Sequence, residues 1–229
     1  HLREFGSRYD VVLLVRPDSF VNHIDDVKIY CDKAKIIYHT CDLHYVRFHR
    51  EYEISGDNEK LKLSKNIKAI EYDAMRTANA SIVHSTAEEQ IIREERAGIK
   101  NVHVFGWAIP VPGAARNFDE RSGAIFVGGF NHGPNSDAVI FFGKEALPSF
   151  WKKAPNFVFH IVGSKVPQEI EELAGPRVIV HGFVEDLDPL LQGARMAVAP
   201  LRYGAGIKGK IATAMAAGLP NVVTSIGAE

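Results

Sequence analysis

Residues 196–224 read MAVAPLRYGAGIKGKIATAMAAGLPNVVT, and this stretch decides the fold of the second half of the chain. The apolar run 196–199 is typical of a buried parallel strand. A glycine-rich turn follows, then an alanine-rich helix over 211–217 that stops at Gly218 and Pro220, and then a second apolar run. Strand, loop, helix and strand in this order predict a parallel α/β unit, with the loop at the carboxyl edge of the sheet.

The loop also carries charge that suits an anion. Arg202, Lys208 and Lys210 lie where the N-terminus of the following helix presents free N–H groups, and together they predict a diphosphate site. The spacing fits neither of the two nucleotide-binding glycine fingerprints. Lys208 and Lys210 are two positions apart, so on a helix they would not share a face. Taken alone, the motif also fits an ordinary turn with solvated lysines.

The same alternation of strands and helices runs through the whole chain. A segment over 107–122 that is rich in proline and glycine and then charged predicts a linker. We therefore expect an α/β protein with two Rossmann-like, doubly wound parallel-sheet units, an incomplete one at 1–115 and a second at 116–229. Strands are expected at 11–15, 35–38, 81–84, 102–105, 124–127, 157–162 and 177–180, and helices at 21–33, 59–78, 86–97, 135–147, 167–173 and 186–192.

Glycine marks the ends of four strands in the second unit. The first of these turns, residues 128–135, reads GGFNHGPN and leads into a helix. Gly163 and Gly182 end two further strands, and the loop after 196–199 is the fourth. Four such turns predict a carboxyl edge that is clear of side chains, where doubly wound sheets bind ligands.

Composition excludes several classes of function. The net charge of −1 provides no general attraction for nucleic acid, so no nucleic-acid partner is expected. Cys31 and Cys41 have no companions at metal-ligand spacing, which argues against a zinc site and fits a reducing compartment. No apolar run is long enough to span a bilayer, and no signal peptide is visible, so we expect a cytoplasmic protein. The remaining histidines are expected in core or rim positions without a metal: His84, His103, His160 and His181.

Taken together, these stretches resemble the donor-binding half of family 4 (group 1) glycosyltransferases, which have the two-domain GT-B architecture. The Gly-Ala-Gly-x-Lys-Gly-Lys loop is similar to a bacterial subgroup of surface-polysaccharide synthesis. Against that family the chain looks truncated at both ends, since a glycine turn early in the first unit and the closing helices of the second are missing. The matching residues are 37–44, 81–88, 126–135, 159–164, 180–184, 194–206 and 214–220.

The resemblance implies a nucleotide sugar in a cleft between the units, with no cofactor and no metal. Asp42 and His44 would be catalytic on the acceptor side, and Asp42 also fits a simple helix cap. The family usually has two glutamates beside this loop, where this chain has Ala205 and Thr213. The implied donor-binding residues are Gly128, Gly129, Asn131, Gly182, Phe183, Val184, Arg202, Gly204, Ala205, Gly206, Lys208, Lys210 and Thr213.

The expected activity is transfer of a hexose from a nucleotide sugar to a glycan or lipid-linked acceptor, with retention of configuration. A lipid-linked acceptor is compatible with peripheral membrane association.

Two alternatives stay open at this point. One is a non-hydrolysing sugar-nucleotide epimerase, which would need acidic residues that the 202–210 loop lacks. The other is a nucleotide-binding module of the same fold without turnover, which Ala205 and Thr213 favour.

Overall fold

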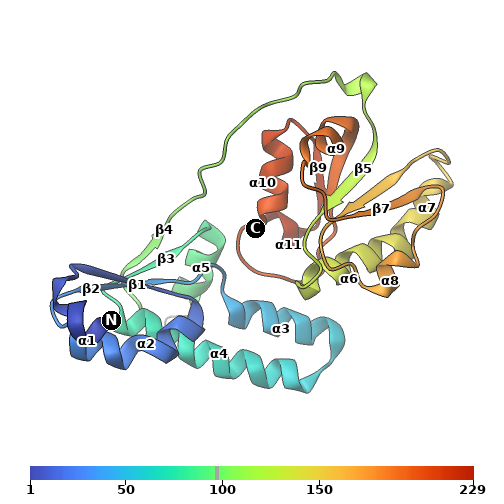
Figure 1. The fold of residues 1–229 in the computed structure, drawn as a ribbon. Helices are drawn as coiled ribbons and strands as arrows, with labels where there is room; N and C mark the ends of the chain where they lie inside the picture. The colour runs from blue at the N-terminus through green and yellow to red at the C-terminus, as the bar shows by residue number, and fades with distance from the viewer. Residues whose placement is uncertain (96–97) are drawn as a thin grey trace. The chain divides into compact units, whose positions relative to one another are not determined.

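The computed structural model describes residues 1–95 and 98–229, which form two compact units (Figure 1). The first unit comprises His1–Trp107 together with Gly204–Ile207 and Glu229, and the second comprises Ala108–Tyr203 and Lys208–Ala228. Each unit contains one parallel sheet covered by helices. The predicted α/β fold with two parallel sheets is therefore confirmed.

The first sheet has four parallel strands in the order β1-β2-β3-β4. Its strands are β1 (Val11–Val15), β2 (Lys35–His39), β3 (Ala80–Val83) and β4 (Val102–Val104). Its helices are α1 (Leu2–Phe5), α2 (Arg16–Tyr30), α3 (His44–Ser55), α4 (Asn58–Thr77) and α5 (Thr86–Glu94), with a 3₁₀ turn at Gly6–Arg8. The end of the helix predicted over 86–97 lies outside the described residues.

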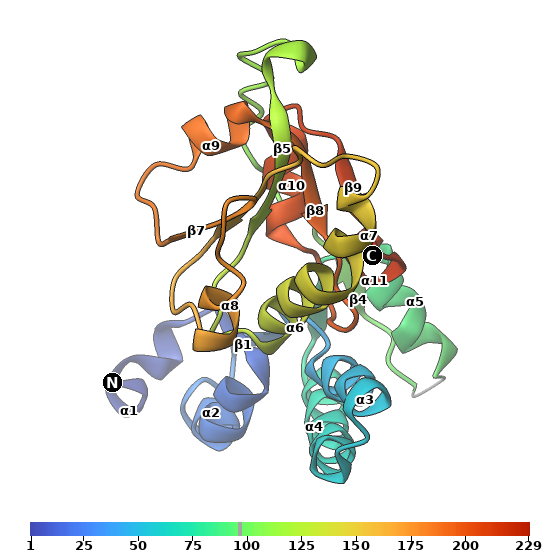
Figure 2. The ribbon, with the colours of Figure 1, turned by 90° about the vertical axis from the view of Figure 1, so that its right-hand side faces the viewer.

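Sequence patterning did not predict α3, which packs along α4 (Figures 1 and 2). Its sequence is mostly polar, and Tyr45 and Val46 are its buried residues. No side chain next to it in sequence caps its N-terminus. The cap comes instead from Glu71 on α4, whose carboxylate accepts the N–H groups of His44 and Tyr45 at 3.0 and 3.2 Å. A cap that is distant in sequence leaves no local start signal.

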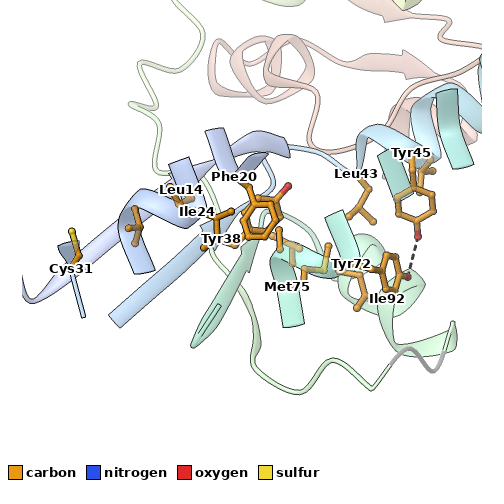
Figure 3. Close-up of a cluster of buried hydrophobic side chains, with 14 residues drawn as sticks. Leu14, Phe20, Ile24, Cys31, Tyr38, Leu43, Tyr45, Tyr72, Met75 and Ile92 are labelled. Atoms are coloured by element: carbon orange, nitrogen blue, oxygen red, sulfur yellow. Dashed lines mark hydrogen bonds between the residues drawn. The ribbon is translucent and has the colours of Figure 1, made fainter. Parts of the chain in front are cut away.

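The core of the first unit lies between its sheet and helices (Figure 3). Tyr38 on β2 is fully buried and meets the ring of Phe20 edge-on, with the centroids 6.2 Å apart. Tyr45 of α3 and Tyr72 of α4 make a second ring contact at 5.8 Å, and their hydroxyls lie 3.4 Å apart. These aromatic contacts join α3 and α4 to each other and α2 to the sheet.

The second sheet has the order β7-β6-β5-β8-β9, with all its strands parallel, so that β5 has β6 on one side and β8 on the other. Its strands are β5 (Ser122–Val127), β6 (Phe159–Val162), β7 (Val178–Gly182), β8 (Ala194–Ala199) and β9 (Asn221–Val223). Its helices are α6 (Gly133–Phe141), α7 (Leu147–Trp151), α8 (Gln168–Glu171), α9 (Asp188–Gly193), α10 (Gly209–Ala216) and α11 (Ser225–Ala228), with a 3₁₀ turn at Phe118–Glu120.

Strand β5 is buried on both faces, as its continuous apolar sequence predicts. Ala124 and Phe126 belong to the core that contains α6. Ile125, which points the other way, belongs to the core that contains Leu191 of α9 and Ala214 of α10. Helices thus cover both faces of the sheet, and the strand order reverses between β5 and β8.

Several predicted boundaries differ from the structure. The helix expected over 21–33 is α2, which spans Arg16–Tyr30 and has Pro17 in its first turn, a position that proline tolerates. The helix expected over 135–147 is divided, because a π-helical turn at Phe142–Ala146 separates α6 from α7. The segment expected to be a linker belongs largely to the second unit, which begins at Ala108 rather than at residue 116. The physical reason is hydrogen bonding: Gly113 N–H donates to the Ala216 carbonyl at 2.9 Å, and Ala115 N–H to the Gln192 side chain at 2.8 Å.

Candidate functional site

The carboxyl ends of β5 and β8 form the switch point of the second sheet. The turn after β5 leads to α6 on one face, and the loop after β8 leads to α10 on the other. Connections that leave in opposite directions open a crevice at this edge, where doubly wound sheets bind their ligands. Both loops singled out in the sequence, 128–135 and 200–210, begin here.

A pocket of about 250 Å³ lies at this edge. A neighbouring pocket of about 550 Å³ shares Leu191 and Thr213 with it and is lined also by residues 109–112. Three of the predicted donor-binding residues are therefore brought together. The smaller pocket is lined by Val127, Gly128, Leu187, Leu191, Lys210 and Thr213.

Lys210 supplies the charge of this pocket. Its ammonium donates to the side-chain oxygen of Asn135 on α6 and lies 4.7 Å from the ring centroid of Phe126. Burial, and then the nearby charge of Lys208, lower the pKa of Lys210 to about 8. Within residues 1–95 and 98–229, no carboxylate pairs with this ammonium. An arriving anion would therefore find a half-buried cation whose charge is not neutralised by a carboxylate.

Arg202, on the same loop, is already paired. Its guanidinium donates to both carboxylate oxygens of Asp137 on α6, one of them at 2.9 Å, and lies over the Phe141 ring at 5.1 Å. The hydrogen bond to Asp137 raises the pKa of Arg202. Lys208 occupies the N-cap position of α10, while Lys210 lies inside the helix. The three cations of the sequence motif thus have three different environments.

At two positions of this edge, only glycine fits, because neighbouring atoms leave no room for a Cβ. A Cβ at Gly128 would lie 2.7 Å from the Asn135 amide nitrogen, and one at Gly163 would lie 1.9 Å from the Gly128 carbonyl oxygen. Gly128 therefore makes room for a side chain, and Gly163 allows the backbones of two turns to approach. Gly182 has a φ of 68°, in the left-handed region that glycine favours.

The other predicted donor-binding residues lie around the pocket or apart from it. Gly129 accepts a hydrogen bond from Asn135, and Asn131 is exposed in the same turn. Phe183 and Val184 follow β7, which is separated from β5 by β6, and Phe183 is 74% exposed. Gly204, Ala205 and Gly206 are grouped with the first unit, and the φ of Gly206 is 70°.

In the first unit, Asp42 and His44 are brought together after β2. His44 Nδ1 lies 3.3 Å from a carboxylate oxygen of Asp42 and 3.2 Å from one of Glu71, and Arg47 pairs with Asp42 at 2.9 Å. Burial lowers the pKa of His44, but the hydrogen bond to Glu71 and the charge of Asp42 outweigh this and raise it overall. A protonated imidazole held in this way can donate a hydrogen bond from its other nitrogen.

Two buried glutamates hold this loop in place. Glu71 is completely buried and accepts the N–H groups at the start of α3. Glu88 accepts the N–H groups of Leu43 and His84, each at 3.1 Å, and burial raises its pKa. Sequence reasoning missed Glu88. The available signal was a glutamate on the buried side of an amphipathic helix, where a carboxylate needs hydrogen-bond donors.

Four histidines within or directly after neighbouring strands form two pairs. His39 and His84 lie 2.7 Å apart through their Nε2 atoms, and His160 Nδ1 lies 2.9 Å from His181 Nε2. Sequence spacing gave no hint of these pairs. Among the described residues, no group of three or more histidines, cysteines or carboxylates is arranged to hold a metal ion. In the same part of the chain, no helix is both long and apolar enough to cross a bilayer.

Comparison with known proteins finds a family match in the second half of the chain. Residues 121–229 match the family model for glycosyl transferases group 1. A search of the curated proteins found no match. This range includes both loops of the switch point and the whole second sheet.

Solved structures share the fold at low sequence identity. A TarM variant from S. aureus, in a complex with fondaparinux, α-GlcNAc-glycerol and UDP, has a TM-score of 0.73 at 17% identity, covering 98% of this chain and 44% of TarM. Sucrose-phosphate synthase from Thermosynechococcus elongatus has a TM-score of 0.71 at 16% identity, with 96% and 57% covered. HepE from Anabaena, in a complex with UDP-glucose, has a TM-score of 0.62 at 16% identity, with 99% and 63% covered.

This chain therefore spans about half the length of these proteins. It has the α/β fold of GT-B glycosyltransferase structures, and its residues 121–229 match the group 1 glycosyltransferases.

Proposed function

We propose that the second unit binds a nucleotide-sugar donor and that the protein transfers the sugar to a glycan or lipid-linked acceptor. The observation that carries this proposal is the match of residues 121–229 to group 1 glycosyltransferases, because that range contains the switch-point pocket with its half-buried Lys210. The solved complexes of TarM and HepE contain UDP or UDP-glucose, which supports a uridine nucleotide as the first ligand to test.

Sugar transfer requires that the site stabilise negative charge on the leaving diphosphate. As the bond between the sugar and the diphosphate breaks, negative charge develops on the leaving nucleoside diphosphate. Fixed cations and free helix N–H groups lower the energy of that state, and they act most strongly where water is excluded. Lys210 and the N-terminus of α10, which begins at Gly209, would serve this purpose.

In the first unit, we assign His44 and Asp42 to the acceptor side. His44 would donate a hydrogen bond to the sugar, and Asp42 would orient the acceptor hydroxyl or take its proton. We further propose that the transferred sugar is a hexose whose configuration is retained, and that no metal or other cofactor takes part. A bacterial cytoplasmic enzyme of surface-polysaccharide synthesis is the setting we infer.

Calorimetric titration with UDP and GDP tests the donor site. The protein should bind one nucleotide with a micromolar dissociation constant, and Lys210→Ala should weaken that binding by about tenfold or more, since a charge-assisted contact is lost. Lys152→Ala, which removes an exposed lysine of the same unit, serves as the matched control and should bind like the wild type. A folded chain that binds neither nucleotide would refute the proposal.

A second candidate function is a nucleotide-binding module without turnover. Thr213 favours it, because it lines the pocket where the family usually has a glutamate, and a hydroxyl makes a weaker contact with a ribose than a carboxylate does. Donor binding without transfer or hydrolysis in the full-length protein would favour this function over the enzyme.

A further inference from the structure

Asn135 lies where three parts of the second unit meet. It sits in the first turn of α6 and is 6% exposed. Its side-chain nitrogen donates to the Gly129 carbonyl at 2.7 Å, and its side-chain oxygen accepts from the Lys210 ammonium. The Asn135 amide thus joins the turn after β5 to helix α10, and both its nitrogen and its oxygen are hydrogen-bonded.

The fit around this amide is close. A Cβ at Gly128 would lie 2.7 Å from the Asn135 side-chain nitrogen, so a glycine is needed there for the amide to occupy its place. Gly128 and Lys210 line the same pocket. The position of Asn135 therefore sets the distance between the glycine turn and the cation at the switch point.

The chemistry of Asn135 differs from that of its neighbour on α6. Asp137 holds Arg202 with a carboxylate and so neutralises it. Asn135 holds Lys210 with a neutral oxygen, so the lysine keeps its charge.

Among residues 1–95 and 98–229, no carboxylate lines the pocket that contains Lys210. Lys208 contributes a cation from the N-cap of α10, and β5 contributes Phe126. The N-cap of α9 contributes Leu187, and α9 itself contributes Leu191. The carboxylate of α9, Asp188, lines the neighbouring pocket instead.

We propose that Asn135 is a positioning residue of the donor site, which fixes the glycine turn and Lys210 against each other while leaving the lysine charge for the phosphates. This inference rests on the proposed donor binding. A measurable consequence follows from Lys210, whose pKa of about 8 leaves it half protonated near that pH. A diphosphate that binds beside the lysine raises that pKa, so the protein takes up a proton as the nucleotide binds.

The test is calorimetric titration of the full chain with UDP at about pH 8, in two buffers with different ionisation enthalpies. The difference between the buffers gives the number of protons taken up, and we expect about half a proton per UDP for the wild type. In Asn135→Asp the new carboxylate pairs with Lys210 beforehand. UDP should then bind about tenfold or more weakly, and proton uptake should disappear.

Two further variants separate charge from structure. Asn135→Ala loses the positioning but adds no charge, so it should bind UDP weakly and still take up a proton. Asn156→Asp adds the same charge at an exposed asparagine of the second unit and should behave like the wild type. If Asn135 were merely structural, the Asp and Ala variants would weaken binding alike without a difference in proton uptake.

Each outcome decides between the two proposals. If the wild type does not bind UDP or GDP, the donor-site proposal fails, and the role of Asn135 falls with it. If the wild type binds UDP without proton uptake, or Asn135→Asp binds as tightly as the wild type, only the role of Asn135 is refuted. Should the substituted proteins not fold, proton uptake by the wild type still tests the inference.

Discussion

Replacing Glu71 by glutamine should destabilise the first unit markedly. The Glu71 carboxylate accepts N–H groups from His44 and Tyr45 at 3.0 and 3.2 Å and lies 3.2 Å from the His44 ring, all without exposure to solvent. Glutamine keeps one oxygen, so one of the two backbone donors loses its acceptor, and the charge is lost as well. A hydrogen bond to a buried charged group contributes about 1.5–3 kcal/mol, so we expect a loss of about 2–3 kcal/mol.

Thermal unfolding followed by circular dichroism measures this loss. For a unit of this size, each kcal/mol of lost unfolding free energy lowers the melting temperature by about 4–8 °C. The melting temperature of the first unit should therefore fall by about 10 °C or more. Hydrogen exchange should show the loss of protection at the start of α3. Glu59→Gln on the exposed start of the same helix is the matched control and should cost less than about 0.5 kcal/mol. Equal shifts in the two variants would refute the assigned capping role.

The loss in Glu71→Gln should also depend on pH. The pKa of His44 is raised in the folded protein, so protonated His44 stabilises the fold. This contribution to stability is fully present below the unfolded-state pKa of about 6.5, and it is lost as the pH rises through the pKa of the folded state. The difference between wild type and Glu71→Gln should therefore be larger at about pH 5.5 than at about pH 8.5. A difference that stays constant would show that the His44–Glu71 contact contributes nothing.

Three further substitutions test the packing. The Tyr38 hydroxyl is buried without a hydrogen-bond partner among the described residues, so Tyr38→Phe should leave the melting temperature unchanged or raise it, and a clear decrease would contradict this reading. Gly163→Ala should cost more than about 2 kcal/mol in urea unfolding, because its Cβ would meet a backbone oxygen at 1.9 Å, whereas Gly175→Ala has open space and should be tolerated. Burial, and then the charge of His84, lower the pKa of His39. The wild type should therefore lose stability relative to His39→Asn as the pH falls below about 6.5. Parallel profiles of unfolding free energy against pH for the two proteins would refute this.

The start of α3 illustrates where local patterning fails. Helices α4 and α5 carry their own start signals, because the side chains of Asp57 and Ser85 cap them from the N-cap position. Helix α3 has no such residue, because its cap is a glutamate on α4. Only the packing of α3 against α4 brings the acceptor to the unpaired N–H groups.

The two loops of the candidate site could be found from the sequence. Glycines and cations between apolar runs predict a turn at the carboxyl edge of a parallel sheet, and the order of strands in the second sheet brings both turns to one switch point. The roles of Gly128 and Gly163 were not predictable, because each glycine is required by a chain segment that folding brings next to it.

Local sequence determines the α/β alternation, since the period of the apolar residues and the turn residues act over a few positions. From the local sequence alone, Arg202 and Lys210 are expected to be equivalent cations of one loop. Tertiary structure distinguishes them, because α6 presents the carboxylate of Asp137 to the first and the amide of Asn135 to the second. Charge availability depends on the partner that folding brings into contact, and residues some seventy positions away in the chain decide it here.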